Sequence, residues 1–270
     1  MNQKLSALCA LATAFFVTKA QAATTVLLND FASGYTDGNL IGPVGTAANT
    51  VGQNGWSQTG AFTGGNPITV SNNQAVLASG ATGQDAYKAF TSVVDSTVAG
   101  NYLLTRINFR ITNPVSATGD YFFHLSSPLG TTSTYFQRLF SRAATGGFQL
   151  GINSGSNSSS AVWGSTVLAI DTAYEAVIKW DFIAGTTNDL LTVYVDPTDQ
   201  VLTNNTVYTS ANWTTTEPTT VAAANLRIGS STTTPGVAID SIQVQVIPEP
   251  GTPALIGLGV LSLLRRVRRI

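Results

Sequence analysis

Cysteine, histidine and methionine each occur only once in this chain, so sites that depend on them are scarce. Cys9 lies inside an apolar N-terminal run, and the remaining chain can therefore form no disulfide bond. His124 is the single histidine, and a metal cluster or a Ser-His-Asp triad would have to use it. A lone histidine in a strand is more often a packing or surface residue. No H-E-x-x-H, C-x-x-C or G-x-S-x-G motif occurs, so neither metal nor nucleophile chemistry is predicted.

Glutamate is also rare, and the chain contains only Glu175, Glu217 and Glu249. Glycoside hydrolysis requires two carboxylates placed on either side of the scissile bond. Glu249 lies near the C-terminus, Glu217 lies in a threonine-rich loop, and Glu175 is expected to point outward beside Lys179. Pairs of aspartates remain open. The pattern favours a protein that is not an enzyme.

Basic residues are few outside the two ends of the chain. Residues 23–250 contain seven lysines and arginines and fourteen aspartates and glutamates, a net charge of −7. No basic patch is visible along this stretch. Nucleic acid is therefore not an expected partner, because its binding depends on clustered positive charge.

The N-terminus has the three parts of an export signal. Lys4 supplies a positive charge, Leu5 to Val17 is almost wholly apolar or small, and Ala20-Gln21-Ala22 is an A-x-A cleavage site. This pattern predicts a signal peptide over residues 1–22, with Ala20 and Ala22 read by signal peptidase.

The C-terminus combines a proline-flanked acid, an apolar run and a basic cluster. Pro248-Glu249-Pro250 precedes the uncharged run from Ala254 to Leu264, and Arg265, Arg266, Arg268 and Arg269 follow it. An apolar run followed by arginines is typical of a membrane segment that stops with its charges in the cytoplasm. A helix of this run would be only ~16 Å long against a hydrocarbon core of ~30 Å. The sequence predicts a short membrane helix that anchors weakly or temporarily; a buried C-terminal helix is the alternative.

These features together resemble the PEP-CTERM sorting tail of Gram-negative bacteria. The resemblance rests on Pro248, Glu249 and Pro250, on the apolar run, and on the terminal arginines. It implies that an exosortase recognises and processes residues 247–270. It also implies an inner-membrane anchor before processing, release to the cell surface or extracellular matrix afterwards, and an association with exopolysaccharide or biofilm.

The chain between the two ends has the composition and periodicity of β structure. Thr, Val, Gly, Ser and Asn dominate, and apolar and polar residues alternate in several segments, which indicates half-buried antiparallel strands. Short strands separated by turn residues predict one two-sheet antiparallel jelly-roll sandwich over residues 23–246. The expected strands are 25–31, 67–78, 86–93, 102–111, 120–126, 134–142, 147–152, 166–170, 173–183, 189–195, 225–229 and 236–246.

The alternation also predicts which side chains form the core. Asp240 is unusual because it shares its phase with Ala238, Ile242 and Val244, so either a bulge turns it outward or it is buried and bonded to backbone N–H groups. The residues expected to be buried are Leu103, Ile107, Phe109, Ile178, Trp180, Phe182, Val193 and Val195.

A second resemblance concerns this sandwich. Ala176 to Phe182 followed by Leu190 to Pro197 resembles the central hairpin of laminin-G and concanavalin-like jelly rolls, and Ala238 to Val244 resembles their last strand. The resemblance implies that residues 236–246 pair near residues 25–31. The E-x-D-x-x-E strand motif of concanavalin-like glucanases is missing.

Two sets of residues are candidates for ligand binding. Trp56, Trp163 and Trp213 lie among small and polar residues and could stack on sugar rings, or could instead close the ends of the sandwich. Asp181, Asp189, Asp196 and Asp199 surround one hairpin and could bind Ca²⁺, although solvated turn acids are the alternative and no D-x-D-x-D loop is present. No metal or cofactor site is assigned.

The sequence therefore predicts an exported, non-enzymatic protein of the cell surface or extracellular matrix. A carbohydrate-binding module is the first alternative, and a glycoside hydrolase is the second.

Overall fold

A computed structural model of the chain describes residues 22–79, 83–114, 116–127, 135–154, 161–199, 202, 204–213, 215–229 and 235–248. Thr25–Val246 form one compact unit. The predicted signal peptide (except Ala22) and the predicted tail beyond Pro248 lie outside the described residues. Within the described ranges, no helix is both long enough and apolar enough to cross a membrane.

The described residues form short and medium β-strands and one 3-10 turn, η1 (Gln53–Gly55). Thr, Val and aromatic residues favour strands because their side chains pack well on a pleated surface. The strands are β1 (Thr24–Asn29), β2 (Gly38–Asn39), β3 (Trp56–Gln58), β4 (Thr69–Ser71), β5 (Gln74–Leu77), β6 (Asp85–Asp95), β7 (Tyr102–Asn113), β8 (Asp120–Ser126), β9 (Tyr135–Ala144), β10 (Gly147–Asn153), β11 (Val162–Trp163), β12 (Ala173–Asp181), β13 (Leu190–Val195), β14 (Thr209–Asn212), β15 (Thr220–Arg227) and β16 (Gly236–Ile247).

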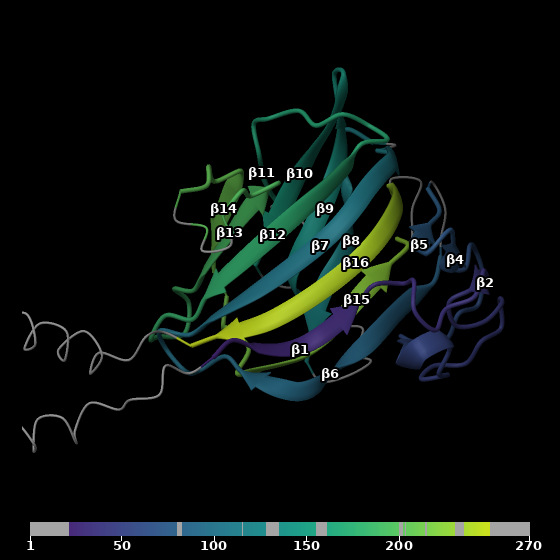
Figure 1. Cartoon of the computed structure of the whole chain (residues 1–270), viewed down its shortest axis with the longest axis horizontal. Coiled ribbons are helices and arrows are strands. Elements are labelled where there is room, and N and C mark those ends of the chain that lie inside the picture. Colours follow the sequence, from purple (N-terminus) through teal and green to yellow (C-terminus); the bar gives the residue numbers. More distant parts are fainter. Residues whose placement is uncertain are drawn as a thin grey trace, which may run out of the picture. The chain divides into compact units, whose positions relative to one another are not determined.

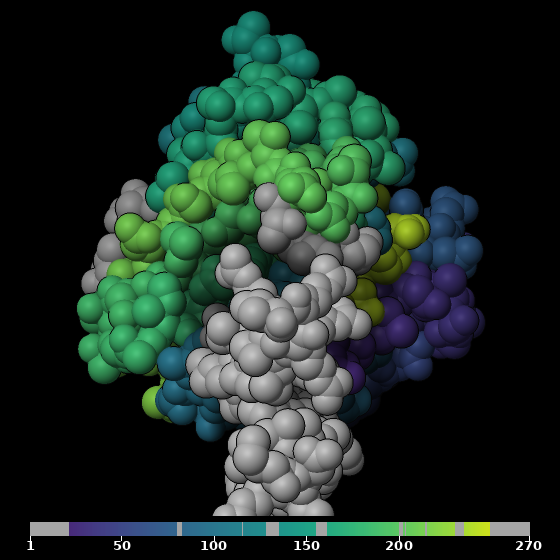
Figure 2. Space-filling model, turned by 60° about the vertical axis from the view of Figure 1, so that its left-hand side comes forward, coloured from purple at the N-terminus to yellow at the C-terminus, as the bar shows by residue number. Residues whose placement is uncertain are grey.

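These strands build two sheets, one of which crosses in front of the other in Figure 1. The nine-stranded sheet has the order β14-β13-β12-β7-β16-β5-β4-β2, and β1 also pairs with β16. The seven-stranded sheet has the order β11-β10-β9-β8-β15-β6-β3. The N-terminal purple segments lie beside yellow β16 in both Figure 1 and Figure 2, so the predicted pairing of the first and last strands is confirmed.

The core lies between the two sheets. Phe109 of β7 lies 5.7 Å from Phe122 of β8, measured between ring centroids, and Phe136 of β9 lies 6.1 Å from Trp180 of β12. Thr105 of β7 donates a hydrogen bond of 2.9 Å to Gln137 of β9 inside this layer. The predicted two-sheet antiparallel sandwich is therefore confirmed.

The predicted core residues are also buried, with one partial exception. Leu103, Ile107, Ile178 and Trp180 have no exposed surface, and Val195 alone among the eight is half-buried at the end of β13. Asp240 is exposed. Because Ile239 and Ile242 are both buried although they lie three residues apart, the alternation of β16 is interrupted there, and the outward alternative for Asp240 is the correct one.

Several predicted strand boundaries were wrong. The segment 67–78 is a hairpin of β4 and β5, because Asn72 and Asn73 adopt positive φ and form its turn. Residues 166–170 contribute only an isolated bridge between Leu168 and Phe148. The strand expected at 225–229 is β15, which begins at Thr220. β2, β3, β11 and β14 were not predicted, since two to four residues are too few to show a period.

Candidate functional site

The outer face of the nine-stranded sheet carries an open groove with a cavity volume of about 690 Å³. Side chains from β5, β7, β12 and β16 contribute to it, together with residues at three strand ends. The groove is lined by Asn72, Gln74, Asn108, Phe109, Arg110, Asp171, Ala173, Tyr174, Glu175, Asp196 and Asp240.

Two aspartates enter the groove from strand ends with left-handed backbone. Asp171 precedes β12 and has φ 56°, and Asp196 follows β13 and has φ 46°. Aspartate adopts this region more readily than most residues because its short side chain bonds locally to the backbone. The Asp196 carboxylate accepts a hydrogen bond of 2.7 Å from the Glu175 backbone N–H. The turns that end these strands therefore also fix where the carboxylates lie.

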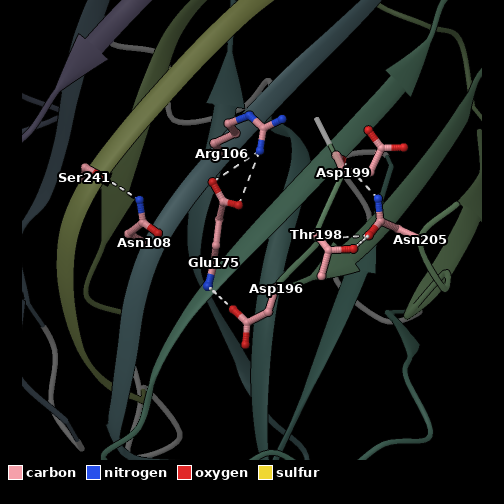
Figure 3. Close-up of polar contacts among 8 residues, drawn as sticks. All are labelled: Arg106, Asn108, Glu175, Asp196, Thr198, Asp199, Asn205 and Ser241. Atoms are coloured by element: carbon pink, nitrogen blue, oxygen red, sulfur yellow. Dashed lines mark hydrogen bonds and ion pairs between the residues drawn. The ribbon is translucent and has the colours of Figure 1, made fainter. Parts of the chain in front are cut away.

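Polar side chains on neighbouring strands also contact one another, and Figure 3 shows these contacts in a row across β16, β7 and β12. Arg106 Nη1 lies 3.3 Å from both carboxylate oxygens of Glu175. Asn108 donates a hydrogen bond of 2.8 Å to the Ser241 hydroxyl. Glu175 was expected to lie beside Lys179. In the structure its ion-pair partner is Arg106 on the neighbouring strand, and Lys179 pairs with Asp181 at 2.5 Å.

The polar row continues beyond β13 into the following loop. Thr198 N–H donates to Asn205 Oδ1 at 2.8 Å, and Asn205 Nδ2 donates to the Asp199 carbonyl at 3.0 Å, as Figure 3 shows. These bonds join both ends of the loop that begins at Asp196. The loop beside the groove is thus held by its own side chains.

The chemistry of the groove is that of hydrogen-bond acceptors. Asp171, Glu175, Asp196 and Asp240 line it with four carboxylates, against the single cation Arg110. Carboxylates accept hydrogen bonds from hydroxyl groups. Side-chain amides can both donate hydrogen bonds to hydroxyl groups and accept them. Such an open acidic groove suits an uncharged ligand rich in hydroxyl groups better than an anion.

The three tryptophans proposed for sugar stacking do not lie together. Trp56 begins β3 with no exposed surface, stacks on Phe31 with ring centroids 5.7 Å apart, and donates to Tyr35 Oη at 2.9 Å. Trp213 is 3% exposed and stacks on Trp180 with centroids 4.7 Å apart. A buried indole has no free face, so in this structure Trp56 and Trp213 offer no ring face to a sugar.

Trp163 differs from the other two because it is only half-buried. It lies in the short strand β11 at the edge of the seven-stranded sheet, not in a loop. Its ring lies 6.1 Å from that of Phe140 on β9. Trp163 is therefore the one member of the predicted set that remains available for contact.

The four aspartates considered for calcium have separate partners. Asp189 is 1% exposed and accepts bonds from Trp180 Nε1 at 2.7 Å and from Ile183 N–H at 2.6 Å. Burial raises the pKa of Asp189, while the hydrogen bonds from Ile183 and Trp180 oppose that rise. Asp181 pairs with Lys179, and no group of three or more metal-ligating side chains that could hold an ion occurs in the described ranges. In the described residues these aspartates therefore do not form one shared site.

His124 is a packing residue on β8. It is 1% exposed, and its ring lies 4.5 Å from that of Tyr135 in an edge-to-face arrangement. Burial, and then the charges of Arg227 and Arg138, keep its pKa well below the usual value, so the imidazole stays neutral.

Sequence reasoning did not identify the groove. Asn108 and Arg110 alternate with the core residues Ile107 and Phe109 on β7, which is the signal that points to this surface. Asp171, Asp240 and Asn72 come from segments more than sixty residues apart, so only the fold brings them together.

Residues 246–269 match the family model of the PEP-CTERM protein-sorting motif. The resemblance predicted from Pro248, Glu249, Pro250 and the terminal arginines is confirmed, and the motif indicates an exported protein that is sorted through its C-terminus. Glu249, Pro250 and Arg265, Arg266, Arg268 and Arg269 lie outside the described residues. No curated protein matches the sequence.

Several solved structures resemble the sandwich at low sequence identity. The CBM2 module of the evolved Dit of Lactobacillus casei BL23 phage J-1 is 14% identical, with a TM-score of 0.47, over 86% of this chain and 99% of the other. Winged bean acidic lectin complexed with methyl-alpha-D-galactose is 14% identical, with a TM-score of 0.44, over 84% and 99%. Peanut lectin with a nine-residue peptide is 13% identical, with a TM-score of 0.42, over 84% and 98%.

Proposed function

We propose that this chain is an exported, non-enzymatic carbohydrate-binding protein of the cell surface or extracellular matrix, which an exosortase sorts through residues 247–270. The match to the sorting motif at residues 246–269 is the observation that carries the proposal. The motif begins where β16 ends at Ile247, and Pro248 follows that strand directly. Because proline lacks the backbone N–H that a sheet ladder needs, it ends the strand.

The sorting tail has three parts with separate tasks in this proposal. Pro248, Glu249 and Pro250 are the segment that the exosortase reads. The apolar run after them holds the segment at the inner membrane, and the terminal arginines keep the C-terminus on the cytoplasmic side. A run this short anchors the chain until it is processed rather than permanently.

Replacing Glu249 with Ala tests the sorting step. In a host with an exosortase, the E249A chain should still reach the membrane but should accumulate unprocessed, as fractionation and intact-mass measurement would show. D37A, which removes an exposed acid from the folded domain, is the control and should be processed normally. Normal processing of the E249A chain would overturn the sorting mechanism.

The acidic groove supports carbohydrate as the ligand class. Its carboxylates and amides can bind several hydroxyl groups at once. An exopolysaccharide at the cell surface would supply such hydroxyl groups in a repeating array. Residues fixed by neighbours, such as Glu175 through Arg106, would bind it with little loss of side-chain freedom.

A glycan array probed with the full-length chain in mild detergent tests this second step. Uncharged glycans should bind, and N108A should weaken binding by about tenfold, as loss of one or two hydrogen bonds does. Asp181→Asn, which changes an acid outside the groove lining on β12, is the matched control. If no uncharged glycan binds, or if both variants behave alike, the groove is not the site.

A glycoside hydrolase is the second candidate, because the groove holds four carboxylates and hydrolysis needs two. Mass analysis of any bound glycan after prolonged incubation separates the two functions. Intact glycan supports a binding protein, and shortened products lost in the E175Q chain would show an enzyme.

A further inference from the structure

The outer face of the seven-stranded sheet carries a row of rings that the groove does not use. Successive ring centroids from Tyr135 to His124, Tyr121, Phe140 and Trp163 lie 4.5, 5.6, 5.4 and 6.1 Å apart. The rings come from β9, β8 and β11, so the row crosses the strands instead of following one of them. We call this row, with the arginines stacked on it, the Arg–aromatic strip.

Three guanidinium groups lie over these rings. Arg227 lies 4.1 Å from the Tyr121 centroid, Arg138 lies 5.1 Å from the same ring, and Arg142 lies 4.4 Å from the Trp163 centroid. A cation over an aromatic face is attracted by the ring quadrupole, whose face is negative. Arg138 is buried, whereas Arg142 and Arg227 are half-buried and reach the surface. The strip therefore presents cations that the rings hold in place.

Arg142 is also fixed from the side. Its Nε and Nη2 atoms donate to Gln149 Oε1 at 3.0 and 2.8 Å. Beneath it, a Cβ atom at Gly151 would lie 2.7 Å from Trp163 Cε3, and one at Gly119 would lie 2.6 Å from Trp163 Cη2. The indole lies close on the backbone because both positions are glycine. Arg142 and Trp163 thus form a rigid stack before any ligand arrives.

The other end of the strip contains buried polar atoms without hydrogen-bond partners. Both ring nitrogens of His124, Oδ1 of Asn225 and Oδ1 of Asp85 are of this kind. Asn225 and His124 are directly paired on β15 and β8, and Asp85 is paired with Arg227 on β6 and β15. Leaving such a group unsatisfied is unfavourable, and native proteins keep few of them. His124 and Asn225 are each 1% exposed, so their atoms lie beneath the strip and not on its surface.

The charge of the strip is opposite to that of the domain around it. Three of the seven basic residues between positions 23 and 250 lie here, although no basic patch is visible in the sequence. The acids beside them are Asp85 and Asp120, and Asp120 binds Arg227 at 3.0 Å. In a region with a net charge of −7, the strip brings two arginines, Arg142 and Arg227, to the surface, and these can attract an anion.

We infer that the Arg–aromatic strip binds a saccharide that carries carboxylate groups. Trp163 and Tyr135, the half-buried rings at the two ends of the strip, contact the sugars, and the half-buried Arg142 and Arg227 bind the carboxylates. Planar guanidinium groups suit carboxylates because they donate two parallel hydrogen bonds. The site is separate from the acidic groove, and it does not depend on whether that groove binds an uncharged glycan.

Titration calorimetry of the full-length chain in mild detergent tests the inference. The probes are an oligogalacturonate, an uncharged galactose oligomer of equal length, and polyglutamate as an anion without sugar rings. Oligogalacturonate should bind, R142Q should weaken its binding by about tenfold or more, and added salt should weaken it further. R142K keeps the charge but loses the planar fork, and should lose most of the affinity as well.

Lys179 supplies the matched control. It is also a cation over a ring, 4.7 Å from the Tyr102 centroid, but it lies on the nine-stranded sheet. Lys179→Gln should leave oligogalacturonate binding unchanged, and near-ultraviolet circular dichroism should show that every variant is folded.

The inference is overturned if folded R142Q binds oligogalacturonate as the unaltered chain does, or if polyglutamate binds equally well, since that would show recognition of charge alone. If R142Q loses oligogalacturonate binding but still binds an uncharged glycan, the strip is supported whether or not the groove is the site of the uncharged glycan. Binding of uncharged glycans alone would uphold the proposed function and refute the strip.

Discussion

The outer faces of the two sheets have opposite chemistry although they share one core. On the nine-stranded sheet, carboxylates such as Glu175 and Asp240 line an open groove with few rings. On the seven-stranded sheet, Arg138 and His124 are almost wholly buried among rings. In both sheets most inward residues are apolar, because alternate side chains must fill the core. The outward residues are free of that demand, so a single sandwich can present two different surfaces.

The largest expected effect concerns the core that both faces share. Trp180 is fully buried and stacks on Trp213, so Trp180→Ala should lower the free energy of unfolding by about 3–5 kcal/mol. Trp163→Ala removes the same side chain from the half-buried strip and should cost clearly less. Urea denaturation of both variants measures the difference. Equal losses would contradict the distinction between core and face.

Asp85 on β6 of the seven-stranded sheet should make the stability of the domain depend on pH. Burial raises its pKa to about 7, although the charge of Arg227 opposes this and Asp120 supports it. The folded state therefore holds a proton that the unfolded chain releases near pH 4, and stability falls as pH rises from about 4 to about 7.

Asp85→Asn should therefore be more stable than the unaltered chain at pH 8, on the order of 2–4 kcal/mol, with the difference gone below pH 4. Thermal melts across this range, with D37N as an exposed control, provide the measurement. A D85N chain that gains nothing at pH 8 would show that the strip does not bury this carboxyl as described.

The indole of Trp163 packs against glycine backbone, so one added methyl group there should lower the stability of the domain. Gly151→Ala places a Cβ atom 2.7 Å from the indole, so the ring must move, at a cost of about 1–3 kcal/mol. Gly64→Ala has no atom within 4 Å of the new Cβ and should change little. Denaturation midpoints and tryptophan fluorescence of the two variants follow the effect; equal behaviour would mean that the indole does not lie against the sheet.

The fold was largely predictable because the core imposes a period of two on long strands. Leu103 to Ile111 and Tyr174 to Phe182 show this period plainly, and both lie where it predicts. In other strands, local interruptions of this period made the burial pattern unreadable from the sequence. β8 has register shifts between Tyr121 and Phe123 and between Phe123 and Leu125, which place adjacent phenylalanines in the core. Strands of two residues such as β11 carry no readable period.

The two surfaces could not be predicted because their residues meet only in the fold. Arg227 and Asp120 form one ion pair across 107 positions of sequence. Trp163 was considered for contact from the sequence, but its arginine and its two glycines come from β9, β10 and the turn before β8. The sorting motif, by contrast, is contiguous, and the sequence alone was enough to identify it.

The most direct test of the account is a crossed binding measurement on the full-length chain. Glu175→Gln changes the groove and Arg142→Gln changes the strip, and each is titrated with an uncharged glycan found on the array and with oligogalacturonate. The account predicts that E175Q weakens only the uncharged glycan and that R142Q weakens only oligogalacturonate, each by about tenfold. A single variant that weakens both ligands equally would contradict the claim that the two faces recognise different sugars.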